Sequence, residues 1–131
     1  MKLDWVLSCR AFSGRGAELD LEGVGVDTFW PGSLPAPIEF AVVLGLRGSR
    51  DDFADPVSVE AYLLGPKMAS LGDLGFELGP IEFPGGYLPG WEFSYLHPLA
   101  ISFDANEFGQ YSLELYVSDQ RATVFFEVRE P

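Results

Sequence analysis

Large apolar side chains alternate with smaller or polar ones along several short stretches of this chain. The stretch 38–48 shows this best, with every second position taken by Ile38, Phe40, Val42, Leu44 and Leu46. Successive side chains of a β-strand point to opposite faces of its sheet, whereas a helix repeats every 3.6 residues or so. The stretch therefore predicts a strand with one buried face and a second face of mixed character.

Strand-like stretches recur between turn residues along the rest of the chain. They cover 3–12, 17–30, 56–65, 99–103, 110–117 and 122–130, with a shorter one at 76–83. The stretch 67–78 has apolar residues near helical spacing, but each of its glycines would cost about 1 kcal/mol inside a helix. We expect one helical turn there at most. The whole pattern predicts an all-β fold, an antiparallel β-sandwich of about seven to nine strands.

Length and composition predict one domain covering residues 1–131. A chain of this size buries roughly two-thirds of its unfolded surface and needs no disulfide or metal for stability. Cys9 is the single cysteine, so no disulfide can form within the chain. Asp4 and Arg10 interrupt the first apolar stretch, which argues against a signal peptide. No apolar run approaches the roughly 18 residues of a membrane span. We therefore expect a cytoplasmic protein.

The charge of the chain excludes two classes of partner. Twenty acidic residues face eight basic ones, for a net charge of −12. Nucleic-acid-binding proteins neutralise phosphates with clusters of Lys and Arg, and an anionic membrane surface would repel this chain for the same reason. We expect neither a nucleic acid nor a membrane as partner. A soluble surface is the simpler explanation of the acidity, and attraction of a basic partner is the alternative.

The segment 104–117, DANEFGQYSLELYV, resembles the tyrosine corner of immunoglobulin-like sandwiches. Gly109 would allow a tight turn, and the hydroxyl of Tyr111 would bond back to the preceding corner. The chain lacks the cysteine pair of antibody domains. The resemblance therefore implies an immunoglobulin-like sandwich in general.

A second resemblance covers nearly the whole chain. It is carried by the stretches LDWVLSCRAF, LEGVGVDTFW and LPAPIEFAVVLGLRG, followed by PGW and GQYSLELYV. Together they look like a family of small bacterial proteins of unknown function. The resemblance implies a bacterial, stand-alone, single-domain protein, and it implies no activity and no catalytic residues.

Groups suited to catalysis or metal binding are few. The single histidine, His97, could serve Cys9 as a base, but a buried structural thiol is the favoured interpretation. We predict no catalytic residues and no cofactor. Asp51, Asp52 and Asp55 form a weak calcium candidate in an acidic loop, where a solvated turn is favoured.

An aromatic segment forms the sharpest candidate for a binding surface. It contains Phe83, Tyr87, Trp91, Phe93 and Tyr95, and Trp30 enters another proline-rich loop. Tyr and Trp often anchor interfaces, and planar rings also stack on sugars. The alternative, which we favour, is that these rings cap one end of the core.

These observations favour a non-enzymatic intracellular protein-interaction domain, an adaptor or a structural subunit. The partner is an unidentified protein or a second copy of the chain, as in a homodimer. The contact surface is either the aromatic set or an exposed edge strand. A carbohydrate-binding module with optional calcium is the alternative, and a hydrolase that uses scattered carboxylates is the weakest candidate.

Overall fold

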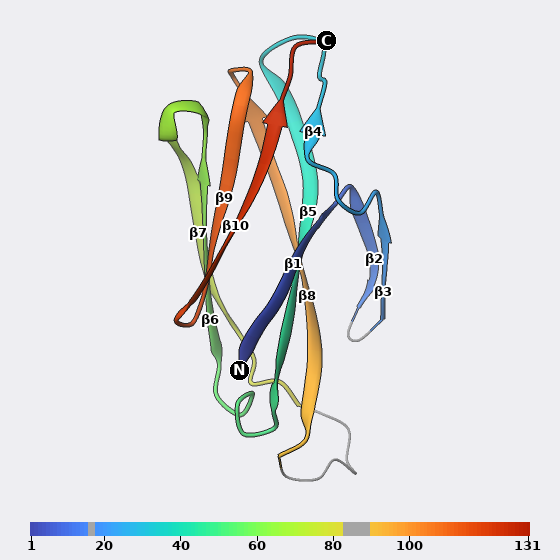
Figure 1. Cartoon of the computed structure of the whole chain (residues 1–131), viewed down its shortest axis with the longest axis vertical. Coiled ribbons are helices and arrows are strands. Elements are labelled where there is room, and N and C mark those ends of the chain that lie inside the picture. Colours follow the sequence, from blue (N-terminus) through green and yellow to red (C-terminus); the bar gives the residue numbers. More distant parts are fainter. Residues whose placement is uncertain (16–17, 83–89) are drawn as a thin grey trace.

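The fold is all-β, as the alternating pattern predicts (Figure 1). The computed structural model describes residues 1–15, 18–82 and 90–131. The described strands and one short 3-10 turn, in chain order, are β1 (Lys2–Cys9), β2 (Ala11–Arg15), β3 (Glu18–Glu22), β4 (Thr28–Phe29), β5 (Ala36–Ser49), β6 (Val57–Leu64), η1 (Pro66–Met68), β7 (Ser70–Leu78), β8 (Glu92–Ala105), β9 (Gly109–Val117) and β10 (Gln120–Val128).

Two sheets pack face to face, and a hairpin lies outside them (Figure 1). The first sheet has three strands in the order β1-β5-β8, and the second has five in the order β4-β10-β9-β6-β7. Within these sheets β4 runs parallel to β10, and the other neighbours are antiparallel. Strands β2 and β3 form the separate hairpin.

The main core lies between the two sheets and contains the predicted face of β5. The alternating side chains from Ile38 to Leu46 pack there against the inward side chains of β6, β9 and β10. Aromatic rings fill one part of this core, with centroids 4.9 to 6.0 Å apart, and they belong to Phe29, Phe40, Phe103, Tyr111 and Phe126. Burial of such side chains contributes about 1.5–3 kcal/mol each, so this face dominates the stability of the sandwich.

The opposite face of β5 is buried as well, which explains its mixed sequence. Ala41 and Val43 lie there beside Cys9, under the hairpin side chains Phe12 and Leu21. Small residues suit this face because large side chains of the hairpin pack onto it. The middle of β5, from Phe40 to Leu46, is therefore covered on both sides.

The tyrosine corner is present. The hydroxyl of Tyr111 donates a hydrogen bond of 2.7 Å to the backbone carbonyl of Glu107, and Gly109 turns the chain with a φ of 142°. Burial raises the pKa of Tyr111, which keeps the donating proton in place. Strands β5 and β8 pair as B and E do in immunoglobulin domains, and β6, β9 and β10 follow the order of C, F and G. The wider immunoglobulin-like assignment stays a prediction.

Several predicted boundaries were wrong. The expected strand 3–12 is divided between β1 and β2, and the expected strand 17–30 between β3 and β4. The expected strand 76–83 ends at Leu78 and begins earlier, at Ser70, as β7, while the single helical turn allowed for 67–78 matches the 3-10 turn η1. The segment 84–98 is expected to be a long aromatic loop with strand pieces, and its residues 92–98 belong to β8 because they pair without a break with the second half of β5.

We predict that Tyr111→Phe lowers the free energy of unfolding by about 1 kcal/mol, because the part-buried hydrogen bond from the Tyr111 hydroxyl to the Glu107 carbonyl is lost. Urea unfolding measures the change. Tyr116→Phe is the matched control, since its hydroxyl makes only a 3.4 Å contact with Glu114. Equal stability of wild type and Tyr111→Phe would contradict a stabilising role for the corner.

Candidate functional site

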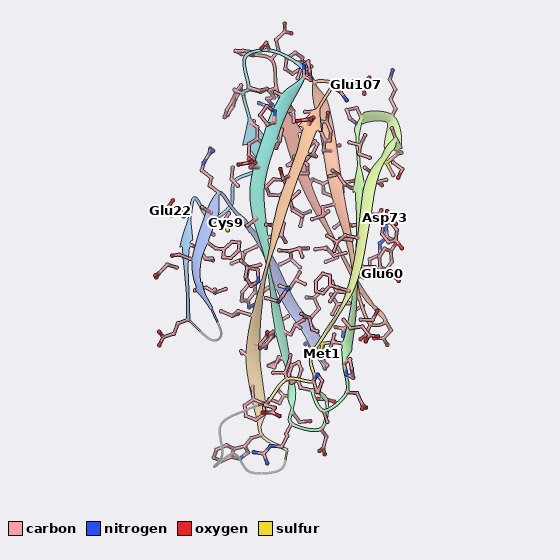
Figure 2. The ribbon with its side chains drawn as sticks, turned by 180° about the vertical axis from the view of Figure 1, so that it is seen from behind. Met1, Cys9, Glu22, Glu60, Asp73 and Glu107 are labelled. Atoms are coloured by element: carbon pink, nitrogen blue, oxygen red, sulfur yellow. The ribbon has the colours of Figure 1, made fainter. Side chains whose placement is uncertain are left out.

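The sandwich is open along the side where β7 and β8 lie. These strands are the outer members of their sheets, and a cleft of about 190 Å³ lies between them. In Figure 2 both strands face the viewer, and side chains lie between them. The large apolar residues of its lining are Leu63, Leu71, Leu74, Ile101, Phe103 and Leu113.

A missing side chain keeps this cleft open. Gly72 lies opposite the inward-facing Leu63, and a β-carbon built on Gly72 would meet no atom within 4 Å. The neighbouring Leu74 also lies on the inward face, yet its side chain is 41% exposed, and Leu71 is 46% exposed. The edge of the sandwich therefore offers apolar surface that its own side chains leave uncovered.

Beside the cleft, alternate residues of β7 direct their backbone N–H and C=O groups to the open edge of the sheet. The N–H of Ser118 donates to the carbonyl of Ser58 at 2.8 Å, so Ser58 directs its backbone groups toward the β9 side. Ser58 lies opposite Glu77 on β7. Backbone direction alternates along antiparallel strands, so Glu77, Gly75 and Asp73 direct their N–H and C=O groups to the open edge. An edge of this kind can pair with another strand.

The outer face beside this edge is acidic. Asp73 lies opposite Tyr62, and the Tyr62 hydroxyl donates to Glu60 at 2.9 Å. The bond to Glu60 is the main cause of a raised Tyr62 pKa, and the charge of Asp73 adds to it. Figure 2 places Glu60 and Asp73 on the same side of the molecule, along β6 and β7.

Strand β8 is less suited to pairing, because Pro98 lies on its open edge. The N–H of Gly25 bonds to the carbonyl of Ser8 at 2.7 Å, so Ser8 directs its backbone groups away from β5. By alternation its partner Val42 faces β8, while Val43 faces away from β8. Pro98 lies opposite Val43 and therefore faces the open edge, where it offers no N–H. Strand β7 is the better acceptor of a partner strand.

Sequence reasoning named an exposed edge strand as a contact surface without identifying which strand it was. In the segment that forms β7, the sequence predicts a strand only over 76–83, and Gly72 and Gly75 serve there only as evidence against a helix. The useful signal was the alternation of Asp73 and Glu77 with Leu74 and Phe76, which is typical of a half-buried strand.

The predicted aromatic surface is divided between the two ends of the sandwich. Trp30 is 58% exposed and lines a hollow with Arg10 and Glu39, while Trp91 is 52% exposed and precedes the residue paired with Ser49. Glu39 and Ser49 are ten residues apart on β5, a distance of about 30 Å along a strand. The two rings therefore cannot share one small contact surface, and the carbohydrate-binding alternative would rest on either ring alone.

The remaining members of the aromatic set have different positions. Phe93 is buried, and Tyr95 is half-buried against the main core, so both contribute to packing. Phe83 and Tyr87 lie outside the described residues. The core-cap interpretation therefore fits Phe93 and Tyr95.

The acidic loop is organised as a turn. Asp52 accepts hydrogen bonds from the Ser49 N–H at 2.8 Å and the Ser49 hydroxyl at 3.1 Å, and it pairs with the Met1 ammonium at 3.2 Å. The Ser49 backbone bond is the main reason why the pKa of Asp52 is lowered. The described part of the chain brings no three His, Cys, Asp or Glu side chains together for a metal, and Asp51 and Asp55 form no such group with Asp52.

Cys9 and His97 lie on opposite faces of the three-stranded sheet. Cys9 packs with Ala41 under the hairpin, and burial raises its pKa. His97 lies opposite the core residue Leu44, its ring centroid is 5.4 Å from that of Phe76, and burial lowers its pKa. A sheet separates the thiol from the imidazole, so the two cannot act as nucleophile and base.

Comparison with known proteins leaves the chain without an assigned family. No family model matches it, and no match is found among curated proteins. The resemblance to small bacterial proteins therefore stays a prediction. Within residues 1–15, 18–82 and 90–131, no helix has the length and apolar character needed to cross a membrane.

We predict that Gly72→Val raises the free energy of unfolding by about 1 kcal/mol, because a β-branched side chain favours the strand and fills part of the cleft. Chemical denaturation measures the change. Gly45→Ala is the control in a filled position, since its β-carbon would collide with the ring of Trp5 and should destabilise the protein. A destabilised Gly72→Val variant would contradict an open cleft at this position.

Proposed function

We propose that this protein is a non-enzymatic interaction domain that binds an extended segment of another protein as an added strand on β7. The observation that carries the proposal is the coincidence of two features at one edge. The backbone groups of Asp73, Gly75 and Glu77 face outward there, and the apolar cleft lies beside them. In strand addition the backbone bonds supply affinity, and pockets for alternate side chains supply specificity.

The size of the cleft suits such a ligand. A cavity of about 150 Å³ lined by Leu, Ile and Phe holds a benzene molecule, so a cleft of 190 Å³ has room for one large side chain. Burying that side chain contributes about 1.5–3 kcal/mol, and each backbone bond adds about 0.5–1.5 kcal/mol. These terms are modest against the cost of ordering a peptide, so we expect weak, reversible binding.

Charge favours a different chain over a second copy as the partner. In an antiparallel pair of β7 strands centred on Gly75, Asp73 of one copy would lie opposite Glu77 of the other. Like charges directly opposite destabilise a strand pair, and each copy carries a net charge of −12. A role inside the cell, as an adaptor or structural subunit, fits the single buried thiol of Cys9.

A proline at the free edge tests the proposal. Peptides selected from a random phage-displayed library on the wild-type protein should bind Gly75→Pro about tenfold more weakly, because proline removes the N–H offered to the partner strand. Gly75→Ala is the matched control and should bind as wild type does, since its β-carbon comes no closer than 3.8 Å to the Val59 carbonyl oxygen. Fluorescence anisotropy measures the dissociation constants.

Two further measurements keep this test decisive. The amide proton of Gly75 should exchange more slowly in the peptide complex than in the free protein, which reports strand pairing directly. If Gly75→Pro does not fold, Gly72→Phe serves instead. Its side chain fills the cleft and should weaken the binding of the same peptides. Unchanged binding by both variants would rule out β7 as the binding edge.

A further inference from the structure

Resting on the proposed function, we infer that the strand bound by β7 alternates large apolar residues with Lys or Arg. The two faces of the β7 edge differ in character. Gly72 and Leu74 face the apolar cleft, whereas Asp73 and Glu77 stand on the outer face. An added strand would continue both faces, so its own side chains must match an apolar inside and an acidic outside.

The pairing geometry gives the spacing of these residues. Side chains directly opposite each other on neighbouring antiparallel strands have β-carbons about 4.5–5.5 Å apart. The partner residues opposite Asp73 and Glu77 are therefore four positions apart, and both point outward. The residues on either side of the one opposite Asp73 point into the cleft. The added strand runs antiparallel to β7, so its residue opposite Glu77 comes first in the sequence. Read from the N-terminus, the inferred pattern is a basic residue, two further residues, a large apolar residue, a second basic residue and a second large apolar residue.

The residue between the two basic positions has more freedom in size. It would lie opposite Gly75, whose β-carbon position has only the Val59 carbonyl oxygen and a Glu60 side-chain carbon within 4 Å. A large outward side chain of the partner can lie over this glycine. Glu60 is opposite Gly75 on β6, so a basic residue here would also face a carboxylate.

The acidic side chains at this edge are well placed to receive a cation from outside. In the described part of the chain Arg47 pairs with Asp4 and Glu92, Arg121 pairs with Glu114, and Arg129 pairs with Glu127. These basic residues are thus engaged on other carboxylates. The net charge of −12 adds long-range attraction for a basic segment and speeds its encounter with the protein.

Synthetic peptides test the charge and the spacing together. The first has the core Val-Lys-Val-Thr-Leu-Lys-Leu between neutral flanks, so that its two leucines face the cleft on either side of the lysine opposite Asp73. The second replaces both lysines by glutamine, the third replaces them by glutamate, and the fourth has the composition of the first with its two lysines adjacent. Each is titrated into wild type, Gly75→Pro, Gly75→Ala and the double variant Asp73→Asn with Glu77→Gln, with binding followed by fluorescence anisotropy.

We expect the lysine peptide to bind wild type about tenfold more tightly than the glutamine peptide in low salt. The glutamate and adjacent-lysine peptides should bind more weakly still. The advantage of lysine over glutamine should fall to about twofold or less in the double variant and in about 0.5 M salt. The double variant keeps β7 and its backbone, so it should bind the glutamine peptide as wild type does.

The outcomes separate this inference from the proposed function. Equal binding of the lysine and glutamine peptides, with both weakened by Gly75→Pro, would overturn the charge inference and leave strand addition standing. Failure of the lysine peptide to bind at about 1 mM, while library peptides of another pattern bind at β7, would have the same meaning. If Gly75→Pro bound every peptide as wild type does, both the charge inference and the proposed strand addition would be overturned. The same would follow if neither the synthetic nor the library peptides bound.

Discussion

Burial of β5 on both of its faces is the constraint on which the rest of the structure depends. One face forms the main core against the five-stranded sheet, and the other lies under the β2–β3 hairpin. Its pairing with β8 runs without a break from Ala36 to Ser49. Strand β1 occupies the other side of β5, and β8 is the outer strand of this sheet. The three-stranded sheet cannot cover all of a five-stranded one, and the uncovered part includes Gly72 and Leu74 on the inner face of β7.

The elements that the sequence predicted well are those specified by local alternation. The face of β5 and the hairpin of β9 and β10 each carry a period of two over seven or more residues, flanked by turn residues. The corner of Tyr111 was also predictable, because Gly109 and the aromatic residue lie close together in sequence. In these segments the same alternation of apolar residues favours a strand and supplies the side chains of the core. Local and tertiary preferences therefore agree.

The candidate site could not be predicted to the same degree, because it depends on which strands end up at the edges. Strand order is a property of pairings between distant segments, and no local signal reports it. Residues 92–98 illustrate the difficulty: Pro98 suggests a loop in isolation, yet an outer strand tolerates it. Trp30 and Trp91 show the converse, since rings that looked like one surface belong to opposite ends of β5.

The composition of β7 combines weak intrinsic stability with protection against unwanted pairing. Gly72 and Gly75 lower the strand propensity, and their lack of side chains leaves the cleft and the outer face open to another chain. An open apolar edge would aggregate with its own copies unless something opposed it, and natural edges use inward or flanking charges for that purpose. Asp73 and Glu77 repel a second β7, while Pro98 blocks pairing at the neighbouring edge. The same two carboxylates would oppose pairing with a second β7 and attract a basic strand, so one arrangement of charge would discriminate between the two partners.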